Sequence, residues 1–162
     1  MNNLTIIYLN KKYTYSYWLA VNKVINEKIY LSTTENFSYD STKEFIKNKL
    51  KNNSPFLLLV NTENNSIVGW CDCEIFNDEK IVLGIGILEP YRNMGYGKLL
   101  IKKMISICKD KKYKYLCLQV RENNKRSMHV YSSLGFKEYN RITDVYYNNN
   151  FKEDIIEMVL NL

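Results

Sequence analysis

The spacing of apolar residues changes from one segment of this chain to the next, and each change predicts a new element. Residues 4–9 form a run rich in β-branched side chains, which predicts a first strand. Apolar side chains recur at helical spacing from residue 15 to 29, and Ser41 and Glu44 have the spacing of a capping box that opens a second helix through Leu50. The same reasoning predicts strands over 55–60, 67–76 and 81–88, a helix over 95–110, a strand over 114–120, a helix over 124–133, and strands near 136–147 and 151–160.

The order of these elements predicts an α/β sandwich built around one mixed sheet. The chain has 162 residues, 46% of them hydrophobic, which is enough to bury a sizeable core. No repeat, Pro/Gly-rich linker or low-complexity segment divides it. We therefore expect one domain spanning residues 1–162.

The most informative segment is the turn between the strand that ends near residue 88 and the helix that begins near residue 95. It reads Arg92-x-x-Gly95-x-Gly97. Such a turn directs unpaired backbone N–H groups toward one point at the positive end of a helix dipole, where phosphate binds readily. The dinucleotide fingerprint does not fit because its third glycine is missing, and no Gly-Lys-Ser/Thr of a P-loop occurs. The turn predicts a site for another phosphorylated cofactor.

A second motif follows in the order and spacing of a known family. The strand Leu116–Val120 precedes Asn124, Tyr131 stands seven residues after that Asn, and Leu134-Gly135-Phe136 closes the segment. Together with the glycine turn, this motif resembles the GNAT superfamily of acyl-CoA-dependent N-acetyltransferases over roughly residues 66–140. The resemblance implies a mostly antiparallel sheet, flanked by about four helices and splayed at a V-shaped cofactor slot.

The resemblance also implies which residues hold the donor substrate, acetyl-CoA. Backbone amides of the turn would surround the pyrophosphate, and main-chain groups of the preceding strand would bond the pantetheine like an added strand. Asn124 would begin the helix and bond the pantetheine arm. The cofactor-binding residues predicted in this way are Ile85, Gly86, Ile87, Arg92, Asn93, Met94, Gly95, Tyr96, Gly97, Lys98 and Asn124.

Acetyl transfer from a thioester to an amine needs an anchored donor, a deprotonated amine and a stabilised thiolate, but neither a metal nor a covalent enzyme intermediate. Tyr131 aligns with the family tyrosine whose hydroxyl reaches the thioester sulfur. A phenol keeps its proton at neutral pH and can donate it to a developing thiolate. Tyr131 is therefore the predicted general acid.

The general base is less well defined. In the ribosomal-protein alanine acetyltransferase branch a Glu five residues before the Asn serves as base, but this chain has Gln119 there, and an amide accepts no proton at neutral pH. Glu27, expected in the first helix beside the acceptor site, is the predicted catalytic carboxylate. Glu74, Asp72 and ordered water stay open as alternatives.

Composition and charge indicate which partners, metals and cellular compartment to expect. The net charge of +6 comes from scattered lysines without a basic arm, so we expect no nucleic-acid partner. Four cysteines and His129 form no ligand pattern, which predicts free buried thiols and no metal. No apolar run could span a bilayer and the first residues lack a signal-peptide pattern, so we expect a cytoplasmic protein without a membrane partner. The sequence leaves open whether it is a monomer or a homodimer.

The acceptor itself is left open by the sequence. The leading hypothesis is a primary amine, and the alternatives are a protein N-terminus or lysine, or a CoA-binding regulatory module without catalysis.

Overall fold

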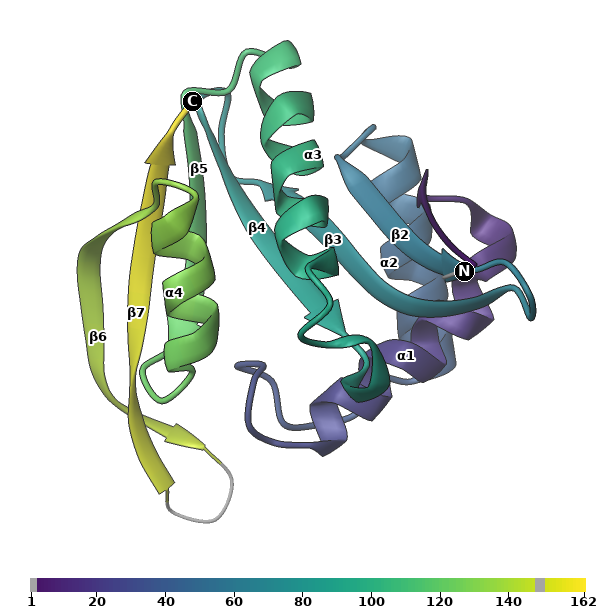
Figure 1. Ribbon diagram of the computed structural model, residues 1–162, viewed down its shortest axis with the longest axis horizontal. Coiled ribbons are helices and arrows are strands. Elements are labelled where there is room, and N and C mark those ends of the chain that lie inside the picture. The colour runs from purple at the N-terminus through teal and green to yellow at the C-terminus, as the bar shows by residue number, and fades with distance from the viewer. Residues whose placement is uncertain (1–2, 148–150) are drawn as a thin grey trace.

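The computed structural model describes residues 3–147 and 151–162, so residues 1–2 and 148–150 of the predicted domain lie outside the described residues. Figure 1 shows one twisted sheet with helices on both of its faces. The elements in chain order are β1 (Leu4–Tyr8), η1 (Lys11–Tyr13), α1 (Thr14–Asn26), α2 (Tyr39–Lys51), β2 (Phe56–Asn61), β3 (Ser66–Ile75), β4 (Lys80–Ile87), η2 (Glu89–Tyr91), α3 (Tyr96–Asp110), β5 (Tyr115–Arg121), α4 (Lys125–Ser133), β6 (Lys137–Tyr147) and β7 (Phe151–Asn161).

The strands of the described residues form one seven-stranded sheet in the order β1-β2-β3-β4-β5-β7-β6. β4 and β5 run parallel, and the other neighbouring strands of this sheet are antiparallel. The predicted fold, a mixed and mostly antiparallel sheet flanked by helices, is therefore confirmed.

The helices cover the two faces of the sheet unequally (Figure 1). α3 and α4 pack on one face, here called the α3/α4 face, where Leu100 and Met104 are buried against strand residues such as Leu118. α1 and α2 pack on the other face, here called the α1/α2 face, where Ile25 contributes to a core with Trp70. The buried strand residues of this second core come from β2 and β3, and Ile7 of β1 packs against it. No helix of the described residues covers β5, β7 and β6 on the α1/α2 face.

The parallel strands β4 and β5 separate partway along their length. Only Lys80–Leu83 pairs with Tyr115–Leu118. The rest of β4, Gly84–Ile87, stays bonded to β3, while the end of β5 stays bonded to β7. The two strands therefore diverge like the arms of a V, as Figure 1 shows, and one edge of β4 is left without a strand partner.

Two boundaries differ from the sequence prediction. α1 ends at Asn26, so Glu27 lies just after the helix rather than inside it. The capping box assigned to Ser41 is wrong, because Ser38 is the N-cap of α2 and its Oγ accepts a hydrogen bond of 3.0 Å from the Ser41 N–H. Ser41 belongs to the first helical turn, where its hydroxyl donates to the Ser38 carbonyl at 2.9 Å.

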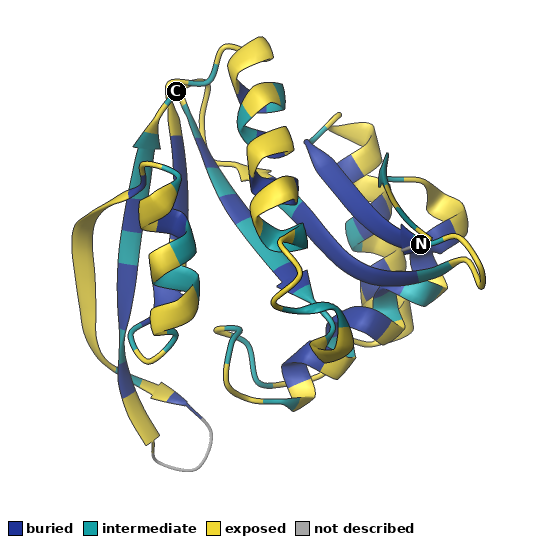
Figure 2. Ribbon diagram, viewed as in Figure 1, coloured by how far each residue is buried: buried dark blue, intermediate teal, exposed yellow. Residues whose placement is uncertain are grey.

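The outer strand β6 is exposed along nearly all of its length, as Figure 2 shows. The four cysteines are free and buried, as the sequence predicts. Among the described residues, none of the helices combines the length and the apolar character that a membrane crossing requires.

Candidate active site

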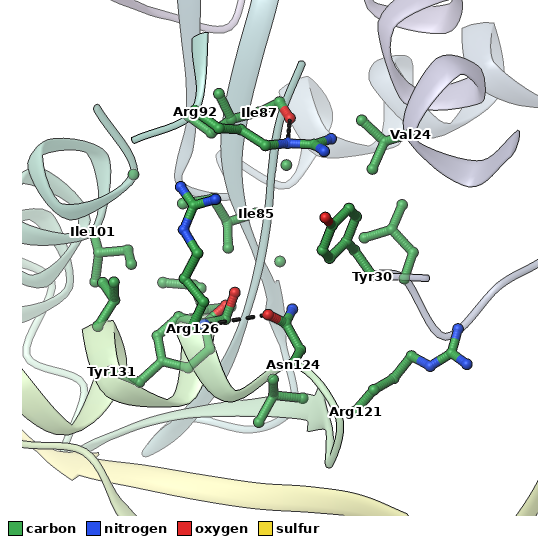
Figure 3. Close-up of a pocket in the computed structure, with 18 of the residues that line it drawn as sticks. Val24, Tyr30, Ile85, Ile87, Arg92, Ile101, Arg121, Asn124, Arg126 and Tyr131 are labelled. Atoms are coloured by element: carbon green, nitrogen blue, oxygen red, sulfur yellow. Dashed lines mark hydrogen bonds between the residues drawn. The ribbon is translucent and has the colours of Figure 1, made fainter. Parts of the chain in front are cut away.

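A cavity of about 520 Å³ lies where β4 and β5 separate (Figure 3). Its walls come from the diverging strands, the η2–α3 turn, the start of α4 and the loop after α1. Of the predicted cofactor-binding residues, Met94 is exposed and is the one that does not line this cavity; the lining ones are Ile85, Gly86, Ile87, Arg92, Asn93, Gly95, Tyr96, Gly97, Lys98 and Asn124.

The glycine turn presents an open backbone to the cavity. Gly95 has φ of 84°, in the left-handed region that a side chain disfavours, and caps α3. A Cβ built on Gly97 would meet nothing within 4 Å. The Leu99 N–H makes the first helical bond, to the Gly95 carbonyl at 3.1 Å, and the N–H groups of a helix's first turn have no partner inside the helix. The turn is suited to an anionic group close to the main chain.

Gly86 makes room for the Trp70 ring on the α1/α2 face of the sheet. A Cβ at this position would stand 2.2 Å from the Trp70 ring, which covers Gly86 on the α1/α2 face. Ile85, its neighbour, packs on the α3/α4 face. The glycine therefore lets the Trp70 ring pack directly against the β4 backbone.

Arg92 connects the glycine turn to two other elements. Its Nε donates to the Ile87 carbonyl at 2.7 Å, and its two terminal nitrogens bond both Glu27 carboxylate oxygens at 2.7 and 2.6 Å. The guanidinium also lies 4.6 Å from the Tyr30 ring centroid. The Glu27 hydrogen bonds are the main cause that raises the pKa of Arg92, so the guanidinium stays charged.

Tyr131 lies on α4 at the inner wall of the cavity and is 7% exposed. Burial raises the pKa of its hydroxyl well above the usual value, and the nearby Cys71 thiol adds to this effect. The phenol therefore keeps its proton throughout the neutral range. Asn124 is the N-cap of α4, where its Oδ1 accepts a hydrogen bond from the Ser127 N–H at 3.2 Å (Figure 3).

The candidate bases occupy different places. Glu27 does not line the cavity and is bound to Arg92. Asp72 and Glu74 both contact Lys49 Nζ, at 3.1 and 2.6 Å. Burial raises the pKa of Asp72, although the charge of Lys49 opposes this. Gln119 does line the cavity.

Sequence reasoning missed two arginines. Arg126 extends from the first turn of α4 into the cavity, and the described residues offer it no ion-pair partner (Figure 3). A cation at a helix N-terminus is unfavourable for the helix dipole, and this mismatch was the available signal.

The second, Arg121, bonds Glu153 at 2.8 Å and the Lys28 carbonyl at 2.8 Å, and it stacks 3.9 Å from the Tyr147 ring centroid. Nothing in the local sequence marks these contacts, because the partners lie far along the chain. With Arg92, it holds the loop after α1 from two sides.

Comparison with known proteins agrees with this geometry. Residues 22–136 match the family described as Acetyltransferase (GNAT) family. A [ribosomal protein bS18]-alanine N-acetyltransferase of Haemophilus influenzae is 41% identical over 91 residues, which cover 55% of this chain and 62% of that protein.

Two solved structures show the same fold. A ribosomal-protein-alanine N-acetyltransferase from Brucella melitensis superposes with a TM-score of 0.89 and 16% identity, covering 98% of this chain and 99% of that one. A phosphinothricin acetyltransferase from Sinorhizobium meliloti, solved in complex with AcCoA, has a TM-score of 0.89 and 13% identity, covering 99% of this chain and 89% of that one.

A sheet that forks beside a glycine-rich helix start is the architecture of an acyltransferase. The chain belongs to the GNAT family of acetyltransferases.

Proposed function

We propose that this chain moves an acetyl group from acetyl-CoA to a primary amine by direct attack in a ternary complex. The observation that carries the proposal is the arrangement of the fork. The open glycine turn stands at one end of the cavity, and the buried hydroxyl-bearing side chain of Tyr131 lines the same cavity. Anion-binding amides and a protonated acid thus border one continuous space.

The residues present fit the donor. The diphosphate would lie against the amides of residues 93–98, where the empty space beside Gly97 accommodates it. Arg126 supplies a positive charge within the same cavity. The unpaired edge of β4 at Gly84–Ile87 offers main-chain groups to the pantetheine amides, although the Ile87 carbonyl already accepts a bond from Arg92.

The chemistry that acetyl-CoA supplies is an activated thioester carbon. The unprotonated amine nitrogen forms a bond to that carbon, and the carbon–sulfur bond breaks with its electron pair on sulfur. Tyr131 donates its proton to this sulfur and regains one from solvent. The balanced result is an N-acetyl amide, CoA as the thiol, and one proton released from the ammonium form of the acceptor.

The acceptor proton must leave before attack. The position of Glu27 favours a role in holding Arg92, and hence the glycine turn, because both of its oxygens are engaged. Water at the fork would then carry the proton away, since desolvation lowers the pKa of an ammonium group. The direct base role predicted for Glu27 stays a prediction that mutagenesis can separate from this one.

The name of one relative supports a protein amine as the acceptor. The Haemophilus influenzae relative is named for acetylating an alanine of a ribosomal protein. A protein N-terminal amine is therefore the second candidate acceptor, beside a small-molecule amine.

A panel assay tests the proposal. CoA release would be followed with purified protein, acetyl-CoA and three amines: an alanine-terminated peptide, an N-blocked lysine peptide and a small polyamine. We expect amine-dependent CoA release and a product heavier by one acetyl group. Binding of acetyl-CoA by calorimetry without CoA release from any amine would support the regulatory-module alternative instead.

A further inference from the structure

The carboxylates around the fork differ in how their charges are balanced. Glu27 pairs with Arg92 at 2.6 Å, Asp72 with Lys49 at 3.1 Å, and Glu153 with Arg121 at 2.8 Å. A carboxylate paired in this way presents little net charge to its surroundings. Glu157 differs, because no lysine or arginine within the described part of the chain reaches ion-pair distance of it. Glu157 is therefore a carboxylate beside the fork whose charge no ion pair of the described residues balances, whereas Asp72 and Glu74 share Lys49.

Glu157 lies beside the point where the strands separate. Leu83 and Leu118 form the last pair between β4 and β5, so Gln119 is the first β5 residue beyond the junction, and it lines the cavity. Glu157 is the β7 partner of Gln119. Side chains of directly paired strand residues lie on the same face, so both belong to one face of the sheet.

The part of that face over β5, β7 and β6 has no helix among the described residues. Strand side chains alternate, and Leu118 packs on the α3/α4 face, so Gln119 and Glu157 project from the opposite α1/α2 face. Gly84, the first β4 residue past the junction, has no side chain, and Asp72 Oδ1 lies 3.0 Å from where its Cβ would stand. Because no helix of the described residues covers Gln119 and Glu157, an acceptor can approach the fork on their side, opposite the side on which α3 and α4 stand.

Two amides hold the Glu157 carboxylate. Gln119 Nε2 donates to Oε1 at 2.8 Å, and Asn140 Nδ2 donates to Oε2 at 2.6 Å. These hydrogen bonds lower the pKa of Glu157, with Lys80 contributing less, so the carboxylate stays ionised. The other titratable groups near it are Lys80, Tyr139 and Cys117. Lys80 Nζ donates to the Tyr139 hydroxyl at 3.4 Å, and the pKa of the Cys117 thiol, raised by burial, also responds to the charges of Lys80 and Glu157. With its NH₂ group engaged, Gln119 has its Oε1 left to accept a hydrogen bond.

We propose that Glu157 supplies the negative charge that draws the protonated acceptor amine to the fork, and that Gln119 positions this carboxylate and meets the amine nitrogen with its Oε1. The inference rests on the proposed function, and it assigns the substrate class as amines that are cationic when they bind. A carboxylate held ionised by two donors is a weak base, so Glu157 attracts the ammonium group, Gln119 contacts it, and water takes the proton.

The experiment compares two nucleophiles of different charge. The alanine-terminated peptide is the cationic amine, and hydroxylamine, which is uncharged at mildly alkaline pH, is the neutral one. Glu157→Gln keeps the shape and removes the charge. We expect the KM of the peptide to rise about fivefold to tenfold. The rate with hydroxylamine and the acetyl-CoA affinity measured by calorimetry should not change.

Two further variants separate a charge effect from a structural one. The exchange Gln119→Glu with Glu157→Gln keeps one amide and one carboxylate in contact and should restore the peptide KM to about the parent value. Glu138→Gln is the matched control, because Glu138 is exposed on the same hairpin but pairs with Met158 of the α3/α4 core, and should behave as the parent.

The possible results separate a failure of the Glu157 inference from a failure of the proposed function. An active parent whose Glu157→Gln variant keeps the peptide KM overturns the inference alone. Equal losses with peptide and hydroxylamine, without recovery in the exchange variant, would assign Glu157 a structural role and overturn it too. A parent that binds acetyl-CoA but releases no CoA with any amine overturns the proposed function.

Discussion

Arg92 and Glu27 form a two-pronged ion pair, with nitrogen–oxygen distances of 2.7 and 2.6 Å. This pair ties the glycine turn that follows β4 to the end of α1, although the residues are far apart in sequence. Bidentate pairs between Arg and a carboxylate fix orientation as well as adding energy. The glycine turn and the end of α1 are therefore coupled through two side chains.

If Glu27 acts by holding Arg92, Glu27→Gln and Arg92→Gln should have similar effects. We expect each to weaken acetyl-CoA binding severalfold, and the double variant to be little worse than either single one, since coupled residues lose their interaction once. Calorimetry on the four proteins measures this cycle, with Glu89→Gln as a control on the neighbouring exposed carboxylate. A base role for Glu27 would instead lower turnover by about 10²-fold or more in Glu27→Gln without a matching loss in Arg92→Gln.

Gly97→Val should abolish measurable acetyl-CoA binding. The new side chain enters the space beside the α3 amides and keeps a diphosphate away from the main chain. Because nothing lies within 4 Å of the point where the new Cβ would stand, the protein should still fold. Calorimetric titration with acetyl-CoA and a circular dichroism melt test both points. Unchanged affinity in the folded variant would remove the turn from the binding site.

Tyr131→Phe should lower turnover by about 10²-fold and leave acetyl-CoA affinity nearly unchanged, because it deletes one hydroxyl and keeps the ring. Its raised pKa means that folded and unfolded chains both hold the phenol proton below the ordinary tyrosine pKa. The difference in unfolding free energy between parent and variant should therefore be independent of pH across the neutral range. Only as the pH rises through the ordinary tyrosine pKa should the parent lose stability relative to the variant, because its unfolded chain ionises first.

The control for this variant is Tyr17→Phe. Tyr17 is also buried with a raised pKa, but it packs in the α1/α2 core. It should retain the parent rate. If Tyr131→Phe turned over as fast as Tyr17→Phe, with the chemical step rate-limiting, the Tyr131 hydroxyl would have no role in catalysis and Tyr131 would be a packing residue.

Gly86→Ala should destabilise the fold by about 1–3 kcal/mol, because overpacking forces shifts in a tight core. The added methyl would stand 2.2 Å from Trp70, whose ring is buried and lies 5.6 Å from that of Tyr17 in an edge contact. Gly97→Ala should keep the stability of the parent, because the space around its new methyl group is open. Thermal denaturation of the two variants measures the contrast, and equal melting temperatures would show that Trp70 can move.

Arg126→Gln should raise the Kd for acetyl-CoA about threefold to tenfold and reduce the salt dependence of binding, since an exposed charge facing an anion is screened by salt. Lys125→Gln is the matched control, because Lys125 does not line the cavity. Titrations at two salt concentrations compare them. Identical salt dependence in parent and Arg126→Gln would place this arginine outside the donor site.

Local patterns predicted most elements, but not the points where an element's end depends on a distant partner. The helical spacing through Ile29 suggested a longer α1, yet the helix ends at Asn26. The loop beyond it is held by Arg92 and Arg121, and neither contact leaves a periodic signal. Likewise Ser41 and Glu44 imitate a capping box, because the sequence does not reveal which of two nearby serines lies at the helix start.

The sequence alone determined the α/β class, the order of the strands and helices, the glycine turn and the Asn124–Tyr131 spacing, because these features depend on local periodicity and backbone conformation. The tertiary structure decided where β4 and β5 part, that Glu27 binds Arg92, and that Gln119 stands against Glu157 on an open face. Those relationships depend on strand register and on which face a side chain occupies. A pairing shifted by one residue would reverse every face, and only the packed sheet fixes it.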